Sequence, residues 1–347
     1  LAPELSTLLS VSSIPVAELR QRIGADETLV EYYQQDAALY AFVLGRDRLH
    51  AIKLESGGMN DEISAFRSAL TRPESTDWKV PAQALYQRLW QPLEPLIAGS
   101  RVVIVAHGTL HYLPFAALQR TDGAFLIDLA SMRMLPSASV LKFLNPLTDA
   151  SPARLLVLGN PDLGDSRLDL EFAGEEARLI AGSQANAQLW MRKEASETNF
   201  KNSGKNYARI HFASHGKFNA DSPLESGLYL ARDATNDGVL TVGELYSMTL
   251  NADLVTLSAC ETGLGKVARG DDVVGLARGF LYAGSRSIVA SLWSVDDEAT
   301  GILMKRLYDN LKKIPKDESL RQAQIKTRQQ FPHPYYWAAF QLSGRAD

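Results

Sequence analysis

Short apolar runs alternate with helical segments throughout the second half of this chain. In chain order the expected strands are 155–159, 208–214, 254–258 and 287–292, and the expected helices are 174–182, 241–246, 272–283 and 296–312. Apolar strands separated by helices are typical of a mostly parallel sheet with helices packed on both faces. The pattern therefore predicts an α/β fold, and in such folds binding sites lie beyond the carboxyl ends of the strands.

The first half of the chain follows a different pattern. Three runs, 28–33, 37–44 and 49–54, are separated by polar turns and predict an antiparallel meander, and helical spacing continues over 82–97. At 347 residues the chain is long enough for about two domain-sized units. The expected divisions are a linker from an upstream region over 1–27, an N-terminal half over 28–150 and a C-terminal half over 151–347.

Two of the apolar runs lead to residues that can carry out nucleophilic chemistry. The run 254–257 leads to Cys260, the only cysteine in the chain, and the run 210–213 leads to His215. A thiol and an imidazole at neighbouring strand ends can meet across one sheet edge. The imidazole can then take the thiol proton and return a proton to the leaving group, which contributes roughly 10²- to 10⁴-fold to the rate. Backbone N–H groups of Gly216 and Cys260 are the candidate oxyanion hole, worth about 10²- to 10³-fold each.

Each of these residues also has a simpler interpretation. A lone cysteine is usually a buried small hydrophobe, and a lone histidine is usually a hydrogen-bonded structural residue. His107 and His111 are four residues apart, as are His211 and His215, but both pairs straddle strand ends and the chain has no Cys-x-x-Cys motif, so a metal site is not favoured. The chain also lacks a Walker A loop and a Gly-x-Ser-x-Gly motif. We therefore expect no metal and no organic cofactor.

Several longer motifs carry a family resemblance. They are His211–Gly216 (HFASHG), Leu254–Gly263 (LVTLSACETG), Gly275–Gly284 (GLARGFLYAG), Ser291–Asp297 (SLWSVDD), His107–Phe115 (HGTLHYLPF) and His333–Phe340 (HPYYWAAF). Together they resemble the CHAT domain, a caspase-like cysteine peptidase family that is related to separase and is commonly appended to tetratricopeptide repeats.

The resemblance implies a fold and a set of roles. The fold is a caspase-like, mostly parallel sheet sandwiched by helices, with a degenerate caspase-like N-terminal half. A His-Gly echo at His107 suggests the same internal duplication, and residues 1–150 contain no cysteine. The implied activity is endopeptidase cleavage of a protein or peptide substrate, with Cys260 as nucleophile and His215 as general base and acid. The implied regulators are an upstream repeat domain or an activator protein.

Two carboxylates are candidates for substrate binding. Asp162 lies just past an expected strand, where the resemblance places the residue that selects the side chain before the scissile bond, and an acid there would favour Arg or Lys. Relatives with basic specificity often have another acid two residues before the cysteine, and Ser258 stands there instead. Asp297 is the second candidate, although Asp296 and Asp297 most simply cap the helix that follows.

Composition limits the partners of the chain. A net charge of −4 and a pI near 5.9, with scattered Lys and Arg, give no case for a nucleic-acid or membrane surface. A single cysteine cannot form an internal disulfide, which favours the cytoplasm. The chain begins without Met, as a segment of a longer protein would.

Two alternatives to the peptidase stay open: a catalytically silent scaffold for protein interaction, and a nucleotide-binding switch that calorimetry with ATP or GTP would reveal.

Overall fold

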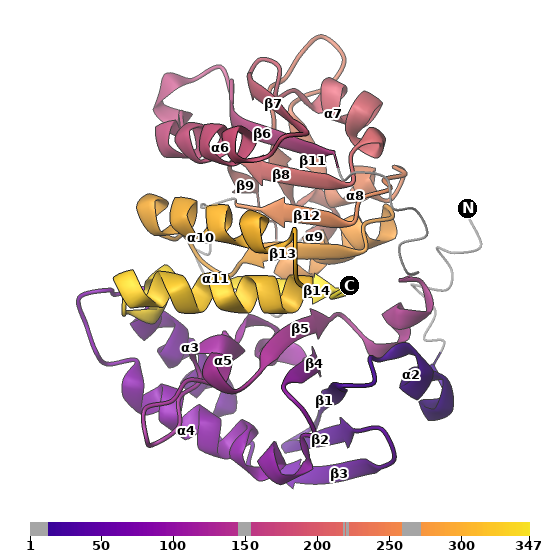
Figure 1. The fold of residues 1–347 in the computed structure, drawn as a ribbon, viewed down its shortest axis with the longest axis vertical. Coiled ribbons are helices and arrows are strands. Elements are labelled where there is room, and N and C mark those ends of the chain that lie inside the picture. Colours follow the sequence, from indigo (N-terminus) through magenta and orange to yellow (C-terminus); the bar gives the residue numbers. More distant parts are fainter. Residues whose placement is uncertain (1–12, 145–153, 218, 220–221, 259–271) are drawn as a thin grey trace.

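The computed structural model describes residues 13–144, 154–217, 219, 222–258 and 272–347. An 11-stranded sheet runs through the whole molecule (Figure 1). From one edge to the other its strands are β3 (Leu49–Leu54), β2 (Ala38–Leu44), β1 (Glu27–Gln35), β4 (Arg101–Val105), β5 (Ser131–Leu135), β14 (Phe340–Gly344), β13 (Ser287–Ser291), β12 (Leu254–Leu257), β8 (Arg209–Ala213), β6 (Leu155–Pro161) and β7 (Ala187–Arg192). The strands before residue 150 therefore occupy one side of the sheet, and the later strands occupy the other.

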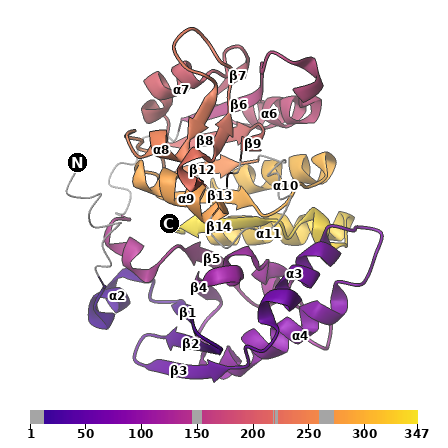
Figure 2. The same cartoon turned by 180° about the vertical axis from the view of Figure 1, so that it is seen from behind.

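Helices cover both faces of the sheet in the C-terminal half. The first face carries α6 (Glu171–Ser183), α10 (Asp297–Asn310) and α11 (Lys316–Gln330), and the opposite face, seen from behind in Figure 2, carries α7 (Glu197–Ser203), α8 (Val242–Leu245) and α9 (Asp272–Tyr282). Side chains of β6 alternate between the two layers: Val157 packs in the cluster of α6, and Leu156 and Leu158 pack in that of α7. The predicted α/β sheet with helices on both sides is confirmed.

The N-terminal half is built around the predicted meander, in which β1 pairs antiparallel with β2 and β2 with β3. Its helices are α2 (Val16–Arg22), α3 (Met59–Leu70), α4 (Lys79–Leu89) and α5 (Leu126–Leu129). The single helix expected over 82–97 is wrong. The α-helix ends at Leu89 and a 3₁₀ segment, Gln91–Leu96, follows. Pro92 and Pro95 cause this change, because proline cannot donate the backbone hydrogen bond that would continue an α-helix.

The strands of the two halves run in opposite directions. β8, β12 and β13 are mutually parallel, β14 is antiparallel to β13, and β14, β5 and β4 are parallel. The carboxyl end of β4 therefore points to the opposite edge of the sheet from the carboxyl end of β8. His107 and His215 follow similar sequence motifs, but they lie beyond opposite ends of the parallel strands in the sheet.

A buried arginine where β5 meets β14 bonds to residues of both halves. Arg133 of β5 donates to Glu27 of β1 through Nε (2.7 Å) and Nη2 (2.8 Å), and through Nη1 to the carbonyl of Gly344 at 2.8 Å. Burial alone would raise the pKa of Glu27, but the Arg133 guanidinium, the Gly24 N–H and the charge of Arg101 together outweigh it, and the pKa lies below its usual value. Arg101 of β4 likewise holds Asp317 of α11, with Nε 2.8 Å from Oδ2.

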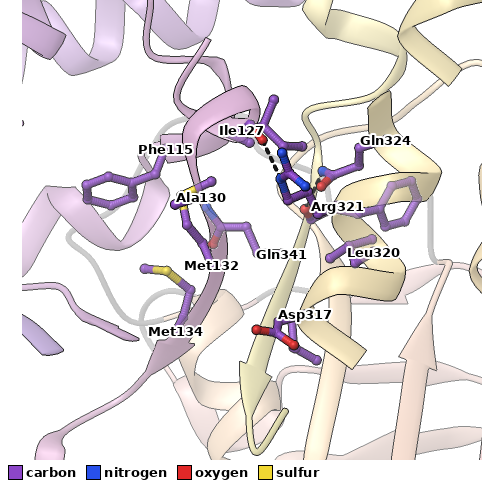
Figure 3. A pocket seen from close by; sticks show the side chains of 13 residues that line it. Phe115, Ile127, Ala130, Met132, Met134, Asp317, Leu320, Arg321, Gln324 and Gln341 are labelled. Carbon is purple, nitrogen blue, oxygen red and sulfur yellow. Dashed lines mark hydrogen bonds between the residues drawn. The ribbon is translucent and has the colours of Figure 1, made fainter. Parts of the chain in front are cut away.

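A small cavity lies at the same junction, between β5, β14 and α11 (Figure 3). Its volume is about 30 Å³, and Phe115, Met132 and Leu320 are among its mostly apolar walls. Arg321 borders it and donates through Nε to the carbonyl of Ile127 at 2.7 Å. A cavity of this size holds one or two water molecules rather than a peptide side chain.

Candidate active site

The strand ends that lead to His215 and Cys260 lie side by side. β8 and β12 are parallel neighbours, with His211 opposite Thr256, and the Ser258 N–H extends the ladder by donating to the carbonyl of Phe212 at 2.8 Å. The carboxyl ends of both strands therefore lie at the same end of the sheet, next to each other. Cys260 itself, with residues 259–271, lies outside the described residues.

The half-buried imidazole of His215 has a defined partner. Its Nε2 lies 2.9 Å from the carbonyl oxygen of Leu168, in the loop between β6 and α6. A carbonyl can only accept a hydrogen bond, so a neutral imidazole donates through Nε2 and carries its basic lone pair on Nδ1. This is the tautomer in which Nδ1 can take a proton from a nucleophile.

The backbone at Gly216 is shaped by a second, three-stranded sheet. Its strands are β9 (Gly216–Lys217), β10 (Gly227–Tyr229) and β11 (Val239–Thr241). Tyr229 donates to the His215 carbonyl at 3.0 Å, and Gly216 stands opposite Leu228 as the next pair along the antiparallel ladder. Bonded and non-bonded pairs alternate in such a ladder, so the Gly216 N–H points away from β10. The ladder to β10 therefore does not use the Gly216 N–H, and its role as an oxyanion donor stays a prediction.

Asp162 is engaged by the protein itself. Its carboxylate accepts from the N–H of Gly164 at 3.0 Å and lies 3.7 Å from Nη2 of Arg192. Arg192 also reaches Asp169 at 2.7 Å and the side-chain oxygen of Asn160 at 3.0 Å. The carboxylate thus closes a turn and faces an internal guanidinium at the end of β7. A role in substrate binding stays a prediction.

Asp297 occupies a more open position at the start of α10. Asp296 provides the helix cap, because its Oδ1 accepts from the N–H of Ala299 at 3.0 Å. Asp297 is exposed, and its pKa lies above the usual value because of partial burial and the nearby charges of Asp296 and Glu176. Asp297 therefore lies near Glu176, and Glu176 in turn contacts Ser258 at the end of β12.

A buried polar cluster behind the strand ends escaped the sequence analysis. Glu176 of α6 accepts from the Ser258 hydroxyl through Oε2 at 3.0 Å, and its Oε1 lies 3.1 Å from Nε2 of His211. The contact between Glu176 and His211 is within ion-pair distance, but it does not have the geometry of a hydrogen bond. Nδ1 of His211 lies 3.2 Å from the hydroxyl of Tyr308, which donates to Thr256 at 3.0 Å. The sign of this cluster in the sequence was a single glutamate, Glu176, at a position on the buried side of its helix.

Among the described residues, no three His, Cys, Asp or Glu side chains gather as metal ligands would. Within the same ranges, no helix combines the length and the apolar character that crossing a bilayer requires.

Comparison with known proteins assigns the family. Residues 79–345 match the family model described as the CHAT domain. The chain belongs to the CHAT domain family. Its curated relatives include tetratricopeptide repeat protein 28 from Mus musculus, at 24% identity over 335 residues, and the Homo sapiens protein of the same name, at 24% over 337 residues. Each match covers 80% of this CHAT domain chain but only 14% of the relative, so the chain corresponds to a small part of those proteins.

Solved structures support the same fold. Two crystal structures of the Saccharomyces cerevisiae separase–securin complex resemble the chain with TM-scores of 0.57 and 0.58, at 12% and 14% identity. Each covers 94% of this chain and 30% of the other. The CHAT domain therefore has a separase-like, caspase-like fold, as the sequence motifs imply.

Proposed function

We propose that this CHAT domain is a cysteine endopeptidase that cleaves a protein substrate with a Cys260/His215 dyad. The observation that carries the proposal is the parallel, in-register placement of β8 and β12, whose adjacent ends lead to His215 and to Ser258, two residues before Cys260. The Leu168 carbonyl supports it, because it selects the imidazole tautomer that has a basic Nδ1.

The proposed reaction is acyl transfer to the thiol. Nδ1 of His215 takes the proton of Cys260, and the thiolate attacks the carbonyl carbon of the scissile peptide bond. The N–H groups of Gly216 and Cys260 donate to the oxygen of the tetrahedral intermediate. His215 then protonates the leaving amine, and the C–N bond breaks. Water, deprotonated by His215, hydrolyses the thioester and restores the thiol.

The proposed substrates have a basic side chain before the scissile bond. Asp297 is the better candidate to bind it, because its carboxylate is exposed and stands beside two other carboxylates. The second candidate, Asp162, faces Arg192 in the free protein, so a substrate guanidinium would have to displace that arginine. A charged pair of this kind supports strong selection when it is removed from water.

The proposed control is exerted by another protein region. Both curated relatives are named for tetratricopeptide repeats, and both similar crystal structures are complexes of two proteins. We infer that appended repeats or a bound activator regulate cleavage, and that the protein acts in the cytoplasm.

The test is covalent labelling with a peptidyl electrophile that carries lysine or arginine at its terminal position. The peptidase predicts labelling of Cys260 that is lost in His215→Ala and weakened in Asp297→Asn. Equal labelling of the wild-type protein and His215→Ala would contradict the dyad and favour the catalytically silent scaffold.

A further inference from the structure

One buried carboxylate connects the two strands that lead to the proposed dyad. Glu176 accepts a hydrogen bond from Ser258 at the end of β12 and lies at ion-pair distance from His211 within β8. The side chains of all three are buried. A carboxylate removed from water is costly unless its oxygens have polar partners. The buried Glu176 carboxylate therefore depends on Ser258 and His211 for its polar contacts.

The packing of α6 brings Glu176 to this position. Gly159 of β6 faces α6 so closely that a Cβ atom there would lie 2.4 Å from the Cβ of Ala177. The missing side chain lets the helix approach the sheet. Ala177 is fully buried against the strands, and its neighbour Glu176 reaches past β6 to the residues of β8 and β12.

A second helix on the same face, α10, also contacts the cluster. Tyr308 is fully buried and contacts both His211 (3.2 Å) and Thr256 (3.0 Å) through its hydroxyl. His211 and Thr256 are register partners on the neighbouring strands. Two helices therefore tie β8 to β12 through side chains, in addition to the backbone ladder.

We propose that Glu176 is a positioning residue for the cleavage reaction: through Ser258 and His211 it holds the ends of β12 and β8 in the alignment that the Cys260/His215 dyad requires. The inference rests on the proposed function. Ser258 precedes Cys260 by two residues and His211 precedes His215 by four. Displacement of a reacting group by about 1 Å can reduce the rate about 100-fold, so a small change at Ser258 is sufficient to disturb the dyad.

The experiment follows the reactivity of Cys260 without any substrate. Because the chain has a single cysteine, alkylation by iodoacetamide reports on that thiol alone. Its rate is measured from pH 5 to pH 9 for the wild type, Ser258→Ala, Glu176→Gln and His215→Ala. Glu175→Gln is the matched control, since Glu175 is the exposed neighbour on the same helix. Circular dichroism confirms that each variant is folded, and kcat and KM for a basic peptide are measured in parallel.

In the wild type we expect half-maximal reactivity well below about pH 8.5, the ordinary midpoint of a thiol. Ser258→Ala should move this midpoint toward that of His215→Ala and slow alkylation at pH 6 about tenfold, because each pH unit changes the thiolate fraction about tenfold. In the same variant kcat should fall with little change in KM. Glu176→Gln should show a smaller shift, since its amide oxygen can still accept from Ser258, and Glu175→Gln should match the wild type.

Two results would overturn the inference in different ways. If Ser258→Ala and Glu176→Gln keep the wild-type pH profile and kcat while His215→Ala changes both, the dyad stands and the positioning role is wrong. If His215→Ala also leaves the profile unchanged, the proposed function and the inference fail together. Ser258→Ala decides alone if Glu176→Gln does not fold, because it removes a single hydroxyl.

Discussion

Nε2 of His215 lies 2.9 Å from the carbonyl oxygen of Leu168, whereas Nδ1 of His107 accepts a hydrogen bond from the backbone N–H of Gln34 at 3.2 Å. The two histidines follow similar strand-exit motifs, yet their rings are held in opposite ways. In His215 the carbonyl meets Nε2, so a neutral ring carries its lone pair on Nδ1, the atom that we propose as the base. In His107 the same Nδ1 is occupied by a backbone donor, and the ring packs edge-on against Tyr33.

This difference predicts separate effects of the two substitutions. His215→Ala should reduce peptide cleavage by about 10²- to 10⁴-fold with little change in stability. His107→Ala should leave turnover nearly unchanged and destabilise the fold by about 1 kcal/mol, because one hydrogen bond to Gln34 is lost. Turnover and urea unfolding of both variants test this. A loss of turnover in His107→Ala equal to that in His215→Ala, at unchanged stability, would contradict it.

The junction of the two halves predicts a stability effect. Arg133→Met should destabilise the protein by about 3–5 kcal/mol, because it leaves the Glu27 carboxylate buried without its main partner. The double variant Arg133→Met/Glu27→Leu should recover part of that loss, since no charge is then stranded. Urea unfolding measures both. A double variant less stable than Arg133→Met would contradict the stranded Glu27 carboxylate as the cause of the loss.

The close contact between α6 and the sheet makes Gly159 intolerant of a side chain. Gly159→Ala places a Cβ 2.4 Å from Ala177 and should destabilise the fold by about 1–3 kcal/mol while lowering turnover, as α6 and Glu176 are displaced. Gly182→Ala is the control, because Gly182 lies in α6 itself with open space around its Cβ position. We expect no loss of stability from that change. Equal melting temperatures for the two variants would exclude the tight contact.

The raised pKa of Asp297 predicts a pH-dependent stability effect. A carboxyl whose native pKa is raised binds its proton more tightly in the folded state, so its contribution to stability falls as pH rises through that pKa. At pH 7 the wild type carries an unfavourable charge near Asp296 and Glu176, and Asp297→Asn removes it. The variant should melt at a higher temperature than the wild type at pH 7, and the difference should shrink below about pH 3.9, the ordinary pKa of aspartate.

Asp296→Ala provides the contrast for this prediction. It removes the side-chain cap of α10 and should destabilise the protein by about 1 kcal/mol at pH 7. A lower melting temperature for Asp297→Asn at pH 7 would mean that attraction to the helix N-terminus outweighs repulsion from the two carboxylates.

The sequence predicted the elements whose causes are local. Alternating apolar runs predicted β6, β8, β12 and β13 and the helices α6, α8, α9 and α10, because each element buries an apolar face. The helix α11 was not predicted. It is largely polar, and it buries Lys316 and Asp317 only because Asp253 (2.7 Å) and Arg101 (2.8 Å) meet them in the fold. Pairings of this kind depend on contacts between distant residues.

The candidate site also contains some residues that the local sequence indicates and others that only the folded structure brings together. The residue types at the ends of β8 and β12 indicated His215 and Cys260 from their order and context. The partner of Asp162 is Arg192, at the end of a strand that the sequence pattern did not predict. Glu176 resembles any helical glutamate until α6 is placed over Gly159, so its contact with Ser258 follows from tertiary packing alone.

Cleavage of one validated protein substrate by the wild type and by Cys260→Ala tests whether Cys260 is the nucleophile of a peptidase. The two proteins are compared at equal concentration, with matching circular dichroism spectra and with any required activator present. We expect cleavage by the wild type and none above background by Cys260→Ala. Cleavage by Cys260→Ala at the wild-type rate would contradict it.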